Sequence, residues 1–208
     1  MSAQVICISR AMLTGADTIA TDVAKALGHR IVDEEIIVRA AQRRNLTPAE
    51  VASVERRKSF LASMVSEISG SSADVINFIT NPKVPAPTDD LRQLIRDAIM
   101  ETAEEGNVVI VAHAASYALA RRKGVLRVLI TGSEFGRVNK WLTTSGGKSP
   151  REAEEIIRES DAARANYLKR FYDVNHESPR DYDICLSIDT LGPTHIAELI
   201  VQAAKAVE

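Results

Sequence analysis

The first thirty residues constrain this chain most, because they predict a strand, a break and a helix in immediate succession. The strand is the wholly apolar run 5–8, and the helix is predicted over 19–28. Its apolar face is formed by Ile19, Val23 and Leu27. The break over 9–18 would leave free backbone amides at the helix start, which is a natural arrangement for binding an anion. The sequence therefore predicts a phosphate site in this break, at the start of an α/β fold.

Four more β-rich apolar runs follow, at 29–32, 108–111, 126–130 and 184–188, and helices are predicted between them. Continuous apolar runs are typical of strands in a parallel sheet that is covered on both faces. Strands that alternate with helices favour right-handed crossovers between neighbouring parallel strands. The predicted fold class is therefore α/β, with a five-stranded parallel sheet between two helical layers.

Length and charge exclude several classes of protein. A chain of 208 residues with 45% apolar content suits one domain with a sizeable core. A formal net charge of −2 gives no indication of a general nucleic-acid or membrane-surface binder, and no apolar run is long enough for a membrane helix. Cys7 and Cys185 both lie in apolar strand-like runs and are expected to be small buried hydrophobes. Without a recognisable signal segment at its start, the sequence favours a cytoplasmic protein.

Residues 45–88 are predicted to form a helical insertion over the core. The run Thr47–Glu50 is a capping box with proline at the first helical position, so a new helix is expected there. Within 60–79 only Glu67 and Asp74 carry charge among many large apolar residues. Such a surface predicts a homodimer through 60–79, although folding of the segment against its own core explains the pattern nearly as well.

Five stretches of the chain form a recognisable series: Ile8–Arg10, Ile31–Glu35, Val109–Val111, Asp161–Tyr167 and Pro179–Cys185. Taken in this order, they resemble the cytidylate-kinase-like proteins among the nucleoside monophosphate kinases. The order and spacing of the stretches carry the resemblance, which covers nearly the whole chain, and Asp161–Tyr167 is the best of them.

The resemblance implies a P-loop-type three-layer sandwich, in one domain over 1–208, with sheet order 2-3-1-4-5. That order places Cys7 centrally and Cys185 at one edge, too far apart to pair. The resemblance makes 45–88 an acceptor-binding insertion and places a short lid within 137–172. The implied activity is phosphoryl transfer from ATP, with Mg²⁺, to a nucleoside monophosphate or similar small phosphorylated acceptor.

The predicted phosphate loop departs from the Walker A pattern, Gly-x-x-x-x-Gly-Lys-Ser/Thr. Gly15 matches the second glycine, but Arg10 replaces the first, and Ala16 and Asp17 replace the lysine and the hydroxyl residue. A side chain at Leu13 limits how closely the backbone can wrap a phosphate if this position needs a positive φ. Asp17 would repel a phosphate by about 4 kcal/mol at 4 Å and an effective dielectric near 20, before screening by salt.

Two interpretations of this loop remain open. In a degraded site, Asp17 only repels a nucleotide. In a re-engineered site, Asp17 and Thr18 hold Mg²⁺, and Arg10 replaces the missing lysine. The donor phosphates would then contact the loop backbone and side chains of Thr14, Gly15, Ala16 and Thr18.

Other candidate site residues follow from position and resemblance. Asp33 ends the second strand and is expected to face acceptor or metal, unless it only caps the next helix. His113 stands where relatives carry an acceptor-binding arginine, and a satisfied strand-end histidine is the alternative. Arg164 and Arg170 are the predicted catalytic cations, with solvated ion pairs as the alternative. Further basic residues of the predicted lid region are Arg137, Lys140, Lys148, Arg151, Arg158 and Lys169.

Three functions are compatible with these observations. The first is a phosphotransferase, which the lid-side arginines favour. The second is a catalytically impaired relative that binds a nucleotide or another anion as a sensor. The third is an interaction protein that keeps the fold for its surface. The substitutions at Leu13, Ala16, Asp17 and His113 favour the second and third functions.

Overall fold

A computed structural model of the chain describes residues 3–33, 35–42, 89–111, 114–120, 122–144 and 149–207. The predicted insertion at 45–88, including the proposed dimer segment at 60–79, lies outside these ranges. The same is true of His113 and of residues 145–148, which belong to the predicted lid region. The predictions made for these residues therefore stay predictions.

The five described strands form one parallel sheet, as predicted. They are β1 (Val5–Arg10), β2 (Arg30–Val32), β3 (Val108–Val111), β4 (Val125–Thr131) and β5 (Ile184–Ser187). Their order is β2-β3-β1-β4-β5, which confirms the predicted topology. The central strand β1 is buried along its whole length, and it pairs with β3 and β4 in parallel register.

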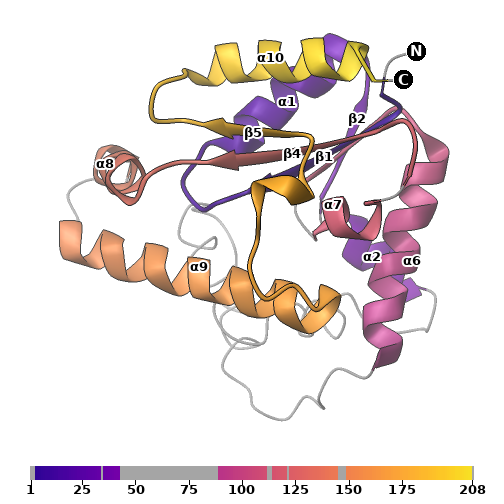
Figure 1. Cartoon of the computed structure of the whole chain (residues 1–208), viewed down its shortest axis with the longest axis horizontal. Coiled ribbons are helices and arrows are strands. Elements are labelled where there is room, and N and C mark those ends of the chain that lie inside the picture. Colours follow the sequence, from indigo (N-terminus) through magenta and orange to yellow (C-terminus); the bar gives the residue numbers. More distant parts are fainter. Residues whose placement is uncertain are drawn as a thin grey trace.

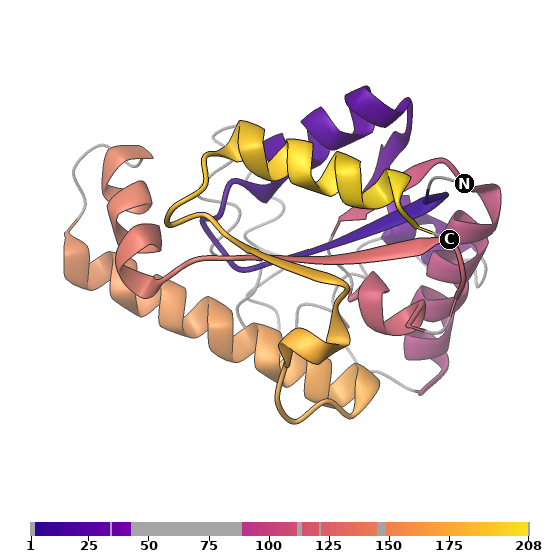
Figure 2. The same cartoon turned by 45° about the horizontal axis from the view of Figure 1, so that its top comes forward.

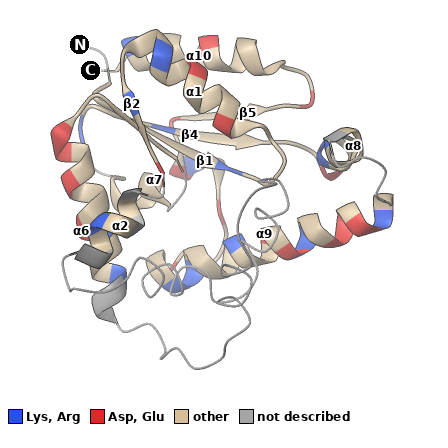
Figure 3. Cartoon of the chain, turned by 180° about the vertical axis from the view of Figure 1, so that it is seen from behind, with Lys and Arg blue, Asp and Glu red and all other residues tan. Residues whose placement is uncertain are grey.

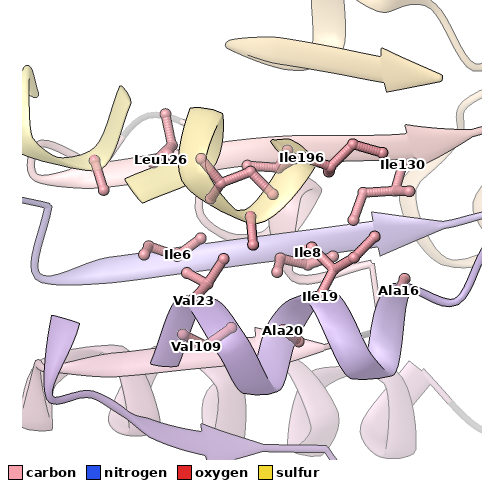
Figure 4. Packing of buried hydrophobic residues seen from close by; sticks show 14 of the residues in the cluster. Ile6, Ile8, Ala16, Ile19, Ala20, Val23, Val109, Leu126, Ile130 and Ile196 are labelled. Atoms are coloured by element: carbon pink, nitrogen blue, oxygen red, sulfur yellow. The ribbon is translucent and has the colours of Figure 1, made fainter. Parts of the chain in front are cut away.

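Helices cover both faces of the sheet (Figures 1 and 2). One face carries α1 (Ala16–Leu27) and α10 (Pro193–Lys205), and the other carries α2 (Glu35–Gln42), α6 (Asp89–Glu105) and α7 (Ala115–Ala118). Figure 4 shows how β-strand and helix side chains meet on the first face, where a labelled group includes Ile6, Ile8, Ile19, Val23, Ile130 and Ile196. Such dense apolar packing holds the carboxyl end of β1 in a fixed position.

Two further helices extend from the carboxyl end of the sheet. They are α8 (Glu134–Thr144) and the long α9 (Pro150–Tyr172), along which charges of both signs are distributed (Figure 3). The Ser149 side chain accepts a hydrogen bond from the Glu152 amide and so caps the start of α9. A single 3₁₀ turn, Pro179–Asp181, leads from α9 towards β5. None of the helices in the described ranges is both long and apolar enough to span a bilayer.

Two boundaries differ from the prediction in a way that shapes the site. Strand β1 continues through Arg10 and helix α1 begins at Ala16, so the connecting loop is only 11–15. The helix predicted between the apolar runs 108–111 and 126–130 is the single turn Ala115–Ala118. The first difference arises because Ser9 and Arg10 pair with β4 opposite Leu129 and Ile130, although both are polar. Polar residues at a buried strand end are frequent at ligand sites of open α/β sheets.

The two cysteines are free, but they differ in exposure. Cys7 is buried in the central strand as predicted, whereas Cys185 is exposed on the edge strand β5, so its predicted burial was wrong. An edge strand has a neighbour on one side only, and the Cys185 side chain is left open to solvent.

We expect a thiol reagent such as iodoacetamide to label one cysteine of the native protein, Cys185. Burial raises the pKa of Cys7 to about 12, so this thiol is both inaccessible and protonated at pH 8. Mass spectrometry of peptides after labelling, with and without denaturant, measures each site. Labelling of Cys7 in the native protein at the rate of Cys185 would contradict the central placement of β1.

Candidate functional site

The loop between β1 and α1 is a short closed turn that exposes the helix start. The Ala11 amide donates to the Ile130 carbonyl at 3.0 Å, and the Thr14 hydroxyl donates back to the Ala11 carbonyl at 2.9 Å. Gly15 precedes the helix with a left-handed φ of 70°, and no side chain of the described residues caps the helix there. The first amides of α1 therefore have no side-chain cap in the described part of the chain, and the predicted binding of an anion there stays a prediction.

Arg10 brings two predicted site residues together. Its side chain is 9% exposed, and its Nη2 lies 3.3 Å from Asp17 Oδ1 and 3.9 Å from Asp33 Oδ2. Its Nε is buried and has no hydrogen-bond acceptor within the described part of the chain. The repulsion expected from Asp17 is thus partly offset by a neighbouring guanidinium. Ala16 is buried at the start of α1, and the exposed Thr18 lies in its first turn.

The loop is anchored to helices α8 and α9 through its own side chains. Met12 and Leu13 are buried with Val138 and Trp141 of α8 and with Ala153 and Ile157 of α9. Leu13 has a φ of 64°, a conformation that strains any residue other than glycine. Burial of its side chain compensates for that strain, because a buried leucine contributes roughly 1.5–3 kcal/mol. The departure at Leu13 therefore joins the loop to α8 and α9.

A cavity of about 530 Å³ opens beside the loop. Thr14 of the loop and Lys140 of α8 line this cavity. The ring of Phe135, at the start of α8, is 76% exposed and also lines it. The connection from β5 to α10 forms the remaining wall, with Asp189 accepting hydrogen bonds from the Ser133 amide at 2.8 and 3.1 Å. The volume is within the range of small-molecule sites, and the wall combines aromatic and polar groups as such sites do.

A second cavity, of about 210 Å³, lies between Ala11 of the loop and α9. Two arginine–carboxylate pairs line it. Arg137 is 6% exposed and donates to both oxygens of Asp161, at 2.9 and 2.6 Å. The other pair joins Arg164 to Glu177. Bidentate pairs of this kind hold a guanidinium in one orientation.

Arg164 is the centre of a hydrogen-bonded network. Its Nε donates to Glu177 at 2.9 Å, its Nη1 to the Arg10 carbonyl at 3.3 Å, and its Nη2 to both Glu177 and the Tyr182 hydroxyl. Burial alone would raise the pKa of Glu177, but the hydrogen bonds and charge of Arg164 hold that pKa below its ordinary value. Burial also raises the pKa of Tyr182 to about 12, so this hydroxyl stays a donor to Glu177.

This arrangement, a short loop after β1 with a cavity and buried cations beside it, agrees with comparisons to known proteins. The profile of the cytidylate kinase-like family matches residues 5–190. The chain belongs to the cytidylate kinase-like family. Among curated proteins, no sequence matches the chain.

Solved structures support the fold of this cytidylate kinase-like protein. An uncharacterised protein from Eubacterium ventriosum has a TM-score of 0.66 at 16% identity, with 98% of this chain and 99% of the other covered. A gluconokinase from Sinorhizobium meliloti has a TM-score of 0.50 at 14% identity, with 98% and 90% covered. The protein TT1252 from Thermus thermophilus has a TM-score of 0.50 at 15% identity, with 99% and 98% covered. At these identities the similarity establishes a P-loop kinase fold and nothing finer.

Arg170, the other predicted catalytic cation of this family member, lies in a different place. It occupies the last turn of α9, 5.7 Å from the Phe171 ring centroid, where cations are favoured by the helix dipole. It lines a separate cleft with Arg92 and Arg96 of α6, and it does not line the cavity beside Arg164. The structure thus brings Arg10, Asp17, Asp33 and Arg164 to the loop but places Arg170 elsewhere.

Sequence reasoning missed three residues of the site in this cytidylate kinase-like chain. Glu177 and Tyr182 complete the Arg164 network, and Phe135 lines the larger cavity. Tyr182 lies in a stretch that carried the family resemblance, so its place near the site had a signal in the sequence. Glu177 and Phe135 carried none, because each is an ordinary residue until the fold places it beside a cavity.

Proposed function

We propose that this protein transfers a phosphoryl group from ATP to a nucleoside monophosphate or a similar small phosphorylated acceptor. The observation that carries the proposal is the cavity that runs from Thr14 of the loop to Phe135 and Pro193. It has room for a nucleoside beside a loop whose amides suit its phosphates. The exposed Phe135 ring offers a face on which a base can stack.

The donor phosphates are proposed to contact the amides of the Thr14–Ala16 segment and the buried Arg10. Phosphoryl transfer depends on positioning and on cations beside the transferring group more than on covalent chemistry. Arg137 and Arg164 line the smaller cavity next to Ala11, so they supply cations on the other side of the loop. Their carboxylate partners keep them oriented before a substrate arrives.

The residues around Arg10 fit Mg²⁺ that arrives with a nucleotide. The described ranges contain no group of three or more His, Cys, Asp or Glu side chains that could hold a metal ion. Mg²⁺ is usually bound by one or two carboxylates together with substrate phosphates. Asp17 and Asp33 converge on the same Arg10 nitrogen, so they are the carboxylates that would hold Mg²⁺, and Thr18 is close in sequence to Asp17. Bound there, the ion would supply positive charge to the developing phosphate oxygens.

A nucleotide sensor without turnover is the second candidate function. One observation favours it: every nitrogen of the Arg164 guanidinium already donates a hydrogen bond within the protein. Such a guanidinium would have to break some of these hydrogen bonds before it could bind a transferring phosphoryl group. The acceptor, the homodimer predicted through 60–79 and a cytoplasmic location stay predictions.

Calorimetric titration with ATP, with and without Mg²⁺, tests the shared first step of both functions. Turnover is then measured with CMP and other nucleoside monophosphates as acceptors. We expect ATP to bind and transfer to CMP to be weak or absent in the unmodified protein. Rapid turnover with CMP would show that the mechanism tolerates all the departures in the loop. Failure to bind ATP under both conditions would contradict both functions.

The substitution Asp17→Asn separates the two interpretations of the loop. Without Mg²⁺ we expect it to raise the affinity for ATP about tenfold, because it removes a charge next to the phosphates and leaves Arg10 in place. With Mg²⁺ we expect it to lower the affinity, because a metal ligand is lost. Calorimetry with and without Mg²⁺ measures the direction of the change in ATP affinity under each condition. A rise in affinity under both would identify Asp17 as a repulsive residue of a degraded site.

A further inference from the structure

The space above Gly15 is occupied by a lysine from another element. A Cβ placed on Gly15 would overlap Nζ of Lys140 and would lie 3.7 Å from its Cε. Lys140 belongs to α8, so this ammonium reaches the loop from the lid side. Two features therefore favour glycine at position 15, its left-handed φ of 70° and the close approach of the Lys140 side chain.

The position of Lys140 is held by its neighbours in α8. Val138 and Trp141 flank it in sequence and are buried against Met12 and Leu13 of the loop. The Thr143 hydroxyl also donates to the Lys140 carbonyl at 2.8 Å. Because the same loop residues anchor this helix, the backbone of Lys140 is held within one side-chain length of the loop.

We propose that Lys140 supplies, from α8, the phosphate-binding ammonium that the loop lacks at Ala16. This inference rests on the proposed function and names a residue of that same site. Lys140 lines the larger cavity together with Thr14, so a phosphate chain on the loop lies within its reach. With Arg10 on β1, the loop then has a cation from each of two elements. The ligand class is a polyphosphate, either free or as part of a nucleotide.

The first test compares Lys140→Met with Lys123→Met. Lys123 is an exposed lysine just before β4, at the amino end of that strand, whereas Lys140 follows the carboxyl end of β4. The control therefore removes the same charge at the opposite end of the sheet. Calorimetry with ATP and with inorganic tripolyphosphate should show a tenfold to hundredfold loss, on the order of one charged hydrogen bond, for Lys140→Met with both ligands. Lys123→Met should bind as the unmodified protein does. Lys140→Arg, which keeps the charge, should bind more tightly than Lys140→Met.

The second test uses a pair of glycines with the same backbone strain. Gly28 has a φ of 68° and nothing within 4 Å of an added Cβ, whereas Gly15 has a φ of 70° and meets Lys140. Gly15→Ala and Gly28→Ala should lower the thermal midpoint by similar amounts, because both place alanine in a left-handed conformation. Only Gly15→Ala should weaken tripolyphosphate binding. The loss should be smaller in a Lys140→Met background, where the displaced ammonium is already gone.

The outcomes distinguish this inference from the function on which it rests. If the unmodified protein binds neither ATP nor tripolyphosphate, the proposed function and the role of Lys140 are both wrong. If it binds them and Lys140→Met binds equally well with an unchanged thermal midpoint, only the role of Lys140 is wrong. If Lys140→Met lowers the thermal midpoint but not the affinity, the side chain is structural and the inference is overturned.

Discussion

Replacing Arg164 with methionine should lower the free energy of unfolding by about 3 kcal/mol. The change leaves Glu177 as a partly buried carboxylate without its guanidinium, and breaking a buried pair in this way typically destabilises by roughly 3–5 kcal/mol. The two side chains are 15% and 24% exposed, so solvent screens them only in part and the lower end applies. Denaturant unfolding followed by circular dichroism measures the loss.

Arg158→Met is the matched control for this substitution. Arg158 lies on the same helix, is 74% exposed and pairs with Glu155 one turn earlier. Its replacement should change stability by less than about 0.5 kcal/mol. The double variant Arg164→Met with Glu177→Leu should recover much of the loss, because no buried charge is then left unpaired. A loss no greater than that of Arg158→Met would show that the network contributes little to stability.

The same network determines a dependence on pH. Arg164 lowers the pKa of Glu177 in the folded state, so this pair stabilises the fold fully above the unfolded pKa near 4.5. This contribution to stability is lost as the pH falls through the lowered pKa of Glu177 in the folded state. The unmodified protein should lose stability on acidification below pH 4.5, and Glu177→Gln should reduce that loss.

Arg164→Ala should also lower any turnover by a factor of about 10² if the charge of Arg164 acts in the transition state.

Replacing Arg10 with methionine should weaken ATP binding by about a hundredfold in the absence of Mg²⁺. Two effects act in the same direction. The buried cation beside the loop is lost, and Asp17 and Asp33 are left without the guanidinium that both approach. Each carboxylate then repels the phosphates by up to about 4 kcal/mol before screening by salt. Calorimetry at two salt concentrations measures the loss and its electrostatic origin.

Two further variants test whether the charge of Arg10 causes the expected loss of ATP affinity. Arg10→Lys keeps the charge and should lose less affinity, although it lacks the planar fork of donors. Adding Asp17→Asn to Arg10→Met should recover part of the affinity, because one of the two carboxylates near the phosphates is then neutral. Unchanged ATP binding in Arg10→Met, at an unchanged thermal midpoint, would place the phosphates away from this loop.

The fold could be predicted because its signals are local and repeated. Apolar runs such as Val108–Val111 and capping signals such as Ser149–Glu152 each determine one element, and alternation of strands and helices leaves few topologies. The sequence predicted Asp33 at the end of a strand, but its approach to Arg10 was not predicted, because it depends on how the strands are placed beside one another. Boundaries were less predictable at Ser9 and Arg10, where polar residues continue a buried strand.

Contacts between distant segments could not be predicted in the same way. Arg164 lies in the stretch of strongest family resemblance and Arg170 follows it, but only the turn of α9 places one beside the loop and the other at a separate cleft. Lys140 was one of several lid-side cations until the packing of α8 placed its ammonium above Gly15. Leu13 looked unfavourable in a phosphate loop, because nothing in the sequence shows that α8 and α9 bury its side chain.

Met12 and Leu13 give the loop a mechanical role as well as a chemical one. A loop of glycines has no side chains by which neighbouring helices can hold it, whereas this loop contributes two side chains to the cluster between α8 and α9. Swinging the helix pair away would expose both, at roughly 1.5–3 kcal/mol each. We therefore expect the loop and the two helices to open together, as one cooperative unit. A ligand that held the loop would then also restrain α8 and α9 through Met12 and Leu13.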